Sequence, residues 1–377
     1  NAVRVIYSET GQQERPEWVL VTTTYSPPFK VKQNRRKATL SLKAMKVVVN
    51  LETGQLLFYD QRGRLILSEK PGTRVFKPTT LQGEPCAFVE QTFVSPADEH
   101  LFGLGQFQDG HLNLRTISRR LTQVNSQIAI PFLLSSKGYG LLWHQYGLTD
   151  YNPADESIPL IKRQKAAENE QLADVTTTAG TRRVAQNQAV YDGRFSVPAD
   201  GTYTLFLDLG GMGNRHYVAV DGQVIIDQSN MWLPPAVSQP VALKAGEHTV
   251  EVLCKADNTP TLSWRQPADH ITFRSPHAER LDYVVFAGSA DEVIGTYRYV
   301  SGDAPLFPKW AYGFWQCRER YTSAKHLVET AKLFREKKLP MDVIVQDWQY
   351  WGQNGWGVPQ FDARNYPDPK AFIEELH

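Results

Sequence analysis

Cysteine is scarce in this chain, and long apolar runs are missing. Only three cysteines occur among 377 residues, and Cys86, Cys254 and Cys317 lie far apart. Such spacing offers neither a disulfide framework nor a set of metal ligands, so we interpret them as free thiols. The longest apolar run, Ile128–Leu134, falls well short of the roughly 18 residues that a membrane-spanning helix needs. The sequence therefore predicts no membrane span.

A charge excess of either sign is also missing. Lysine and arginine number 41 against 40 aspartates and glutamates, which gives a formal net charge of +1. So balanced a chain is a poor candidate for binding nucleic acid or an anionic membrane surface. Since the sequence also contains no metal-binding constellation and no phosphate-binding loop, we expect no cofactor.

Aromatic residues, by contrast, are abundant. They make up 11% of the chain, with 9 tryptophans and 16 tyrosines. Many will lie in a core, but the excess suits a sugar-binding protein, because the C–H faces of pyranose rings stack on indole and phenol rings. A hydrophobic content of 41% is typical of a globular protein, and 377 residues predict two or three domains.

The first 160 residues consist of short strand patterns separated by turn residues. This regular spacing, without a convincing long helix, predicts a large β-sandwich over 1–160. Residues 162–169 are charged and polar, as in a linker. A second, self-contained strand pattern follows, and the spacing of its turns favours hairpins. We therefore expect a β domain at 165–280 inserted into a loop of the sandwich, with 281–305 as the return of the sandwich and a linker.

A glycine-containing motif interrupts the first sandwich at Phe102–Gln106 (FGLGQ), and Phe107–His111 (FQDGH) follows it. Two glycines two residues apart permit a tight backbone excursion. The glutamine, aspartate and histidine after it could then point toward a ligand. A plain turn of the sandwich explains the same spacing, so both interpretations stay open.

The stretch from Trp310 to Trp351 has the pattern of a strand, a helix and a second strand. The first strand is predicted at Tyr312–Gln316. Ser323 is a good N-cap, and the apolar residues after it recur at the spacing of one helix face. Pro340 ends that helix, and Met341–Val345 is typical of a buried strand. Two such strands joined by a helix make a parallel βαβ unit.

Side chains suited to sugar binding follow both predicted strands. Trp315 and Gln316 end the first strand, while Asp347, Trp348 and Trp351 follow the second. In parallel α/β folds, ligands lie at the carboxyl ends of the strands. We therefore predict a sugar-binding active site there, although Trp315 and Gln316 could equally pack in a barrel core.

Two further expectations concern the C-terminal region and the insert. A (β/α)8 barrel takes roughly 250 residues, so 306–377 is expected to form about the first quarter of one. Trp232 lies in a proline-flanked segment that we expect to be a loop of the inserted domain. There it could offer a platform for the distal sugars of an oligosaccharide, or it could pack in the core.

Five motifs in this order resemble glycoside hydrolase family 31, which includes α-glucosidases and α-xylosidases. They are Phe102–Gln106, Pro131–Trp143 (PFLLSSKGYGLLW), Asp282–Phe286 (DYVVF), Gly313–Tyr321 (GFWQCRERY) and Val345–Trp351 (VQDWQYW). The resemblance covers 1–160 and 281–377 and implies an N-terminal β-sandwich followed by a (β/α)8 catalytic barrel. The segment 165–280 resembles a protective-antigen-type β domain, similar to the insert of bacterial α-xylosidases that act on xyloglucan oligosaccharides.

The resemblance implies a retaining mechanism with two aspartates, a nucleophile and an acid/base. Both belong to later barrel strands, so we expect them beyond residue 377 and assign no catalytic residue to this chain. Asp347 matches the aspartate that binds sugar hydroxyls in the −1 pocket. Trp348 matches a residue of the pocket wall that is smaller and aliphatic in many α-glucosidases.

The size of the side chain at this wall affects which sugar the site accepts, because xylose is glucose without the C6 hydroxymethyl group. A large side chain in the vacated space rejects glucose sterically. We therefore expect release of α-linked xylose from the non-reducing ends of xyloglucan oligosaccharides, in the periplasm, at the surface or in the medium of a bacterium. An α-glucosidase and a transglycosylase of the same family are alternatives. A glycan-binding protein without catalysis is the alternative of another class, against which the unfinished barrel argues.

Overall fold

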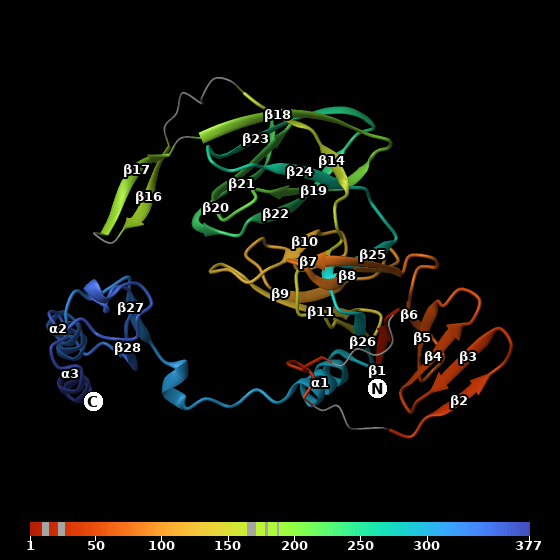
Figure 1. Ribbon diagram of the computed structural model, residues 1–377, viewed down its shortest axis with the longest axis horizontal. Coiled ribbons are helices and arrows are strands. Elements are labelled where there is room, and N and C mark those ends of the chain that lie inside the picture. Colours follow the sequence, from red (N-terminus) through yellow and green to blue (C-terminus); the bar gives the residue numbers. More distant parts are fainter. Residues whose placement is uncertain (10–14, 22–26, 164–170, 178–179, 187) are drawn as a thin grey trace. The chain divides into compact units, whose positions relative to one another are not determined.

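The computed structural model describes residues 1–9, 15–21, 27–163, 171–177, 180–186 and 188–377 (Figure 1). The chain divides into two compact units. Asn1–Val175 and Thr181–Asp303 form the first unit, and Ala304–His377 make up most of the second. Within the described residues, no helix has both the length and the apolar character to span a membrane.

A β-sandwich of two five-stranded antiparallel sheets forms the base of the first unit. The first sheet has the order β1-β26-β12-β11-β9 and the second β10-β13-β25-β8-β7. The strands are β1 (Ala2–Tyr7), β7 (Val75–Leu81), β8 (Glu84–Val94), β9 (Leu101–Gln106), β10 (Arg119–Leu121), β11 (Ile128–Ser135), β12 (Tyr139–Trp143), β13 (Thr149–Tyr151), β25 (His270–Ala278) and β26 (Leu281–Ala287). Buried side chains from both sheets share one core, as the alternation of apolar residues predicted.

A meander of five strands adds a third sheet to this core. Its strands are β2 (Lys30–Gln33), β3 (Lys37–Ser41), β4 (Met45–Asn50), β5 (Leu56–Asp60) and β6 (Leu65–Ser68). Met45, Val47 and Phe58 point into the core, because alternate residues of a strand face the same side. The short strands separated by turns that were predicted in this region are confirmed.

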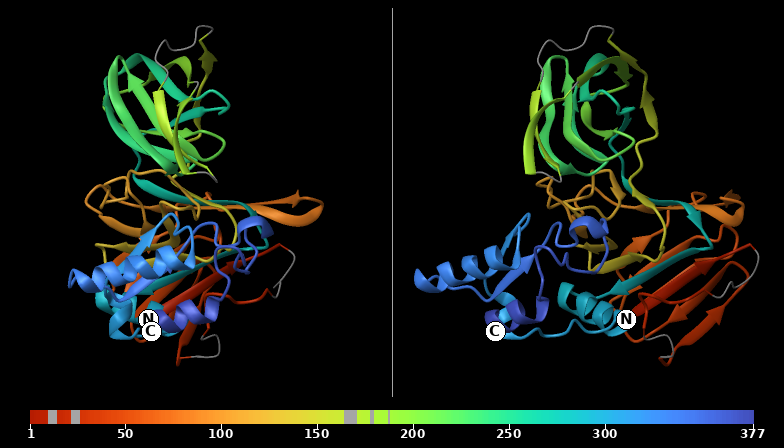
Figure 2. Two further views of the ribbon diagram at one scale, coloured as in Figure 1. Left: turned by 90° about the vertical axis from the view of Figure 1, so that its left-hand side faces the viewer. Right: turned by 60° about the vertical axis from the view of Figure 1, so that its left-hand side comes forward.

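The inserted β domain has its own core and two further sheets, which close into facing layers (Figure 2). The sheet orders are β14-β24-β19-β22 and β15-β18-β23-β20-β21. The strands of this domain are β14 (Glu156–Ile158), β15 (Leu160–Lys162), β18 (Gln188–Val197), β19 (Gly201–Asp208), β20 (Gly213–Val220), β21 (Gln223–Leu233), β22 (Ala236–Leu243), β23 (Gly246–Lys255) and β24 (Thr261–Arg265). A separate hairpin consists of β16 (Gln171–Thr177) and β17 (Gly180–Gln186).

These strands shift the expected boundaries of the insert. The sheets of the inserted domain run from Glu156 to Arg265, whereas the sequence analysis expected 165–280. Strand β25, which lies inside that expected range, pairs with β8 and β13 of the first sandwich. Of the expected linker at 162–169, residues 164–169 lie outside the described part of the chain.

The helix α1 (Ala290–Ser301) occupies a stretch that was expected to be sandwich and linker. A capping box starts it: Ser289 Oγ accepts from the Glu292 amide at 3.4 Å, and the Ser289 amide donates to Glu292 Oε2 at 2.8 Å. Val293 on its inner face is fully buried against a small apolar cluster that includes Phe132 and Phe286. Strand β26 is the expected return to the sandwich, and the helix after it was not predicted, because tertiary burial stabilises a helix with a weak apolar stripe.

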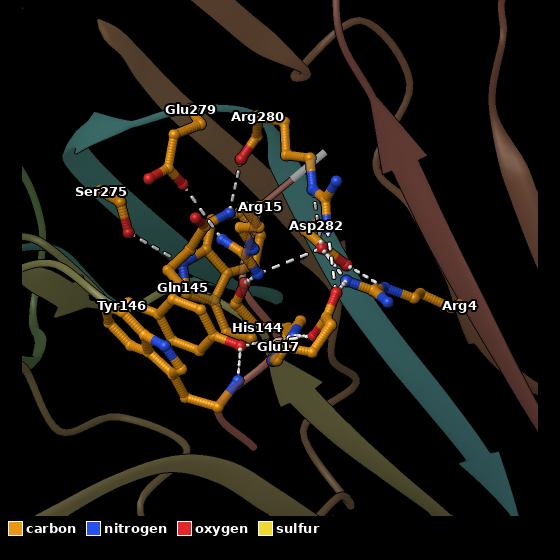
Figure 3. Close-up of polar contacts among 12 residues, drawn as sticks. Arg4, Arg15, Glu17, His144, Gln145, Tyr146, Ser275, Glu279, Arg280 and Asp282 are labelled. Carbon is orange, nitrogen blue, oxygen red and sulfur yellow. Dashed lines mark hydrogen bonds and ion pairs between the residues drawn. The ribbon is translucent and has the colours of Figure 1, made fainter. Parts of the chain in front are cut away.

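A partly buried network of charged residues ties the N-terminal segment to strand β26 (Figure 3). Arg4 donates to both oxygens of the fully buried Asp282, at 2.9 and 2.7 Å, and Arg15 reaches the same carboxylate at 3.2 Å. Arg4 also donates to Glu17 at 2.6 Å, and His144 Nε2 lies 2.8 Å from the other oxygen of Glu17. Because these charges satisfy one another, the network is structural.

The second unit contains the βαβ unit that the sequence predicted. Strands β27 (Trp315–Arg318) and β28 (Val343–Gln346) pair in parallel, and α2 (Ala324–Glu336) connects them. Ser323 caps α2, as expected, and Leu327, Val328 and Ala331 form its buried face. The remaining elements are the 3₁₀ turns η1 (Lys309–Tyr312) and η2 (Gly352–Asn354), and α3 (Pro369–Leu376).

Candidate active site

A hydrogen bond joins the residues that precede the two parallel strands of the second unit. A Cβ atom added at Gly313 would lie 2.1 Å from Asp342 Oδ2, so any larger residue would displace this carboxylate. The same Asp342 oxygen accepts from the Phe314 amide at 2.9 Å. This contact holds the starts of β27 and β28 together, and the residues at their carboxyl ends, Cys317 and Asp347, therefore lie side by side.

Asp347 carries the carboxylate of the site. It is exposed at the end of β28, and its Oδ2 lies 3.8 Å from the Cys317 thiol sulfur. Burial and then the neighbouring Asp347 charge raise the pKa of the Cys317 thiol. A thiol held protonated in this way is a weak donor to the carboxylate and a poor nucleophile. Cys317 is therefore not a candidate nucleophile.

Three tryptophans form an indole cluster beside this carboxylate. The Trp348 amide donates to the Glu319 carbonyl at 2.8 Å, which joins the loops after β28 and β27. The Trp348 ring makes edge contacts with Trp351 and Trp356, at centroid distances of 5.1 and 4.9 Å. Trp351 is 8% exposed, and the Trp348 indole nitrogen is buried without a partner among the described residues. The three indoles thus form a bulky aromatic cluster, with Trp351 buried and Trp356 80% exposed.

The two residues predicted on the first strand take different positions. Gln316 donates to the Tyr321 hydroxyl at 3.2 Å, so its amide is engaged inside the unit. Trp315 is 48% exposed and stacks on Trp310 at a centroid distance of 6.1 Å. The structure thus groups Asp347, Trp348 and Trp351, while Trp315 and Gln316 lie on the neighbouring strand.

Sequence reasoning missed Trp356 and misplaced Trp232. Trp356 follows η2, and nothing in its Gly-rich surroundings indicated that the chain returns to Trp348. Trp232 was expected in a loop, but it belongs to strand β21 of the first unit, because the chain pairs with β20 up to Leu233. Its ring is 47% exposed, so it is not a core residue.

The chemistry available at the strand ends is that of holding a sugar. A carboxylate can accept from two vicinal hydroxyls through charge-assisted bonds, and indole faces can pack on a pyranose ring. Among the described residues, no group of three or more histidines, cysteines or acidic residues could hold a metal ion.

A βαβ unit of a barrel with a carboxylate and indoles at its strand ends, preceded by a β-sandwich, defines a class of carbohydrate-active enzymes. Comparison with known families specifies the class. Residues 1–152 match the N-terminal galactose mutarotase-like domain of glycosyl hydrolase family 31, and residues 304–377 match the TIM-barrel domain of that family. The chain belongs to glycoside hydrolase family 31.

Individual relatives include α-xylosidases. The chain is 27% identical over 348 residues to an α-xylosidase of Saccharolobus solfataricus, covering 90% of this chain and 32% of that protein. It is 24% identical to an uncharacterized family 31 glucosidase of Pseudescherichia vulneris, over 91% of this chain and 47% of the relative. Among solved structures, a family 31 α-xylosidase of Xanthomonas citri superposes with a TM-score of 0.81 and 28% identity, over 99% of this chain and 45% of that one. The chain thus spans less than half the length of these relatives.

Proposed function

We propose that this chain belongs to a retaining α-glycosidase that releases α-linked xylose from the non-reducing ends of xyloglucan oligosaccharides. The observation that carries the proposal is the indole of Trp348, which follows Asp347 in the sequence and makes edge contacts with Trp351 and Trp356. A wall of this bulk leaves little room for the C6 hydroxymethyl group of glucose. Xylose lacks that group, and the α-xylosidases among the relatives support the same choice.

In this proposal, Asp347 binds two neighbouring hydroxyls of the xylose ring. Its bonds strengthen as the ring distorts toward an oxocarbenium-like transition state, so that they lower the barrier more than they tighten substrate binding. In this proposal, neither the nucleophile nor the acid/base is assigned to a residue of 1–377. The retaining outcome is tested directly, because proton NMR of early product distinguishes α-xylose from β-xylose.

The substrate preference is tested on the full-length enzyme with aryl glycosides. We expect kcat/KM to be higher for 4-nitrophenyl α-xyloside than for the α-glucoside. The substitution Trp348→Val should raise the ratio of α-glucoside to α-xyloside activity at least tenfold, because it opens the space that C6 needs. A matched change of an exposed indole far along the chain, Trp18→Val, should leave the ratio unchanged.

Two results would count against the proposal. A wild-type enzyme that prefers the α-glucoside would be an α-glucosidase of the same family. If Trp348→Val lowered both activities by the same factor, the indole would support the site without selecting the sugar.

A further inference from the structure

The chain makes a turn directly after Asp347, and one residue of this turn has unusual backbone angles. The φ of Gln349 is 59°, in the left-handed region that residues other than glycine seldom adopt. The Gly352 amide donates to the Gln349 carbonyl at 3.2 Å, and the rings of Trp348 and Trp351 lie 5.1 Å apart between centroids. Because Gln349 lies between the two indoles, its backbone angles decide whether Trp351 returns to Trp348.

The place of Gln349 in the chain does not explain its left-handed angles. Gln82 and Asp221 form two-residue hairpin turns, and Lys338 follows the end of α2. Hairpin turns and helix ends favour such angles. Gln349 lies at neither kind of position, since it belongs to the irregular loop between β28 and η2. A contact from another part of the chain is therefore needed to hold it.

Arg320, in the loop after β27, makes that contact. Its Nη1 donates to Gln349 Oε1, and both side chains are partly buried. One position earlier in each loop, the Glu319 carbonyl accepts from the Trp348 amide at 2.8 Å. Two consecutive residues of one loop thus bind two consecutive residues of the other. The first bond joins backbone groups, whereas the second depends on the side chain of Arg320.

The groups in these loops gain little from the conformation they adopt. Besides the left-handed Gln349, the Trp348 indole nitrogen and Glu319 Oε1 are buried without a hydrogen-bond partner in the described part of the chain. Unfavourable backbone angles persist where surrounding contacts impose them, and they cluster at active sites. The contact from Arg320 therefore acts on the residues next to the proposed sugar site.

We propose that Arg320 is a positioning residue for the indole that selects the sugar. By holding Gln349 in its left-handed conformation, Arg320 keeps Trp351 against Trp348, and the Trp348 indole stays where it excludes the C6 hydroxymethyl group. The effect on sugar selection rests on the proposed function, while the hold on the indole pair does not.

The substrate preference of full-length variants tests this inference, through the ratio of kcat/KM for 4-nitrophenyl α-xyloside to that for the α-glucoside. Arg320→Ala should lower this ratio about fivefold, because a charge-assisted bond is lost while the indole itself remains. Arg320→Lys keeps a charged donor and should lower the ratio less than about twofold. The matched control is Arg364→Ala, at an exposed arginine of the same unit, which should leave the ratio unchanged.

Two substitutions of Gln349 show whether Arg320 acts through the backbone of this residue. Gln349→Leu removes the acceptor and keeps a Cβ atom, so it should change the ratio as much as Arg320→Ala, and the double variant should change it no further. Gln349→Gly also removes the acceptor, but glycine adopts left-handed angles without steric cost, so the ratio should change less than about twofold. Equal losses in Gln349→Leu and Gln349→Gly would overturn the inference.

Near-ultraviolet circular dichroism follows the indole pair without any substrate, because its signal depends on fixed packing of the rings. The signal that is lost in Trp348→Val belongs to this indole. Arg320→Ala should lose most of the same signal, and Arg364→Ala should keep it. Thermal unfolding verifies the fold of each variant, and if Arg320→Ala does not fold, Gln349→Leu tests the loss of the same bond.

The outcomes separate the inference from the proposed function. A folded Arg320→Ala enzyme with the wild-type ratio overturns the inference, whether its two activities are unchanged or fall by the same factor, and leaves the proposed function intact. A wild-type enzyme that prefers the α-glucoside overturns the proposed function. In that case, loss of the Trp348 signal in Arg320→Ala retains Arg320 as a positioning residue, and an unchanged signal overturns this role as well.

Discussion

Among single residues, Asp347 bears most directly on the proposed chemistry, because its exposed carboxylate makes no ion pair within the described part of the chain. Asp347→Asn keeps the shape but removes the charge from its bonds to the sugar. Hydrogen bonds to charged groups contribute about 1.5–3 kcal/mol, so two weakened bonds predict a fall in kcat/KM on the order of 100-fold. Initial rates on 4-nitrophenyl α-xyloside measure it, and Asp303→Asn, at an exposed aspartate, is the control. If kcat/KM fell less than threefold, Asp347 would not be one of the residues that bind the sugar.

The partly buried network of charged residues around Glu17 makes a second prediction at the residue scale (Figure 3). Burial alone would raise the pKa of Glu17, but the bonds from Arg4 and His144 outweigh it and lower that pKa to about 2. An unfolded glutamate titrates near pH ~4.3. The stability gained from Glu17 is therefore complete above that pH, declines as the pH falls, and is lost below about 2.

Glu17→Gln should accordingly lower the free energy of unfolding by about 2 kcal/mol at pH 7, with a much smaller difference from wild type near pH 2.5. Urea titrations of both proteins at the two pH values measure this difference. The control is Glu52→Gln, since Glu52 pairs only loosely with Arg36 at 3.8 Å and both side chains are exposed. If the difference in unfolding free energy between Glu17→Gln and wild type did not change with pH, the shape of the Glu17 side chain, not its charge, would be what stabilises the protein.

The individual elements show how far the sequence could predict the fold. Strong periodicity with a cap identified α2, and short strand patterns separated by turn residues identified the strands of the meander. The helix α1 was missed although Ser289 and Glu292 form a recognisable capping box, because the adjacent strand pattern masked it. For β27, the strand was predicted at Tyr312–Gln316 but forms at Trp315–Arg318. The turn η1 and the close contact at Gly313 take up the residues before Trp315, so the strand begins later than predicted. As a result Cys317, not Trp315, lies beside Asp347.

The packing of α1 on the sandwich depends on one glycine. A Cβ added at Gly140 of β12 would lie 2.5 Å from Val293 Cγ1 and 3.0 Å from Phe132 Cζ. Gly140→Ala should therefore lower the free energy of unfolding by about 1–3 kcal/mol through overpacking. Val293→Ala alone should also destabilise by about 1–3 kcal/mol, because it leaves a cavity.

The double variant is expected to be more stable than the sum of the two changes predicts, by on the order of 1 kcal/mol, since each relieves the other. Urea denaturation of all four proteins measures this coupling. Gly211→Ala, at a glycine with open space around it, should change stability by less than about 0.5 kcal/mol. If the changes in unfolding free energy of Gly140→Ala and Val293→Ala were strictly additive, α1 would have moved away from the sandwich, so that Val293 is not compressed against the added methyl group.

On the scale of the whole molecule, the sequence predicted an insert but not where it leaves the sandwich. A strand pattern shows that a segment is extended, and it does not show which sheet the strand joins. Strand β25 follows the insert after a short break and looks like one more of its strands, yet Ile271 and Phe273 are fully buried in the first core. The same limit applies to Trp356, whose approach to Trp348 depends on the path of the loop after η2.

The observed topology predicts which deletion the sandwich will tolerate. Strands β13 and β25 are neighbours, with Tyr151 opposite Phe273, and Arg274 pairs with Asp155 at 2.6 Å near the point where the chain leaves the sandwich. The ends of the insert therefore lie close together, so a short Gly-Ser linker in place of 156–268 should leave a folded host. Deletion of 165–280 removes β25 and its buried side chains, and that variant should fail to fold. Soluble yield and cooperative thermal unfolding distinguish the two, and equal behaviour of both deletions would contradict the assignment of β25 to the first sandwich.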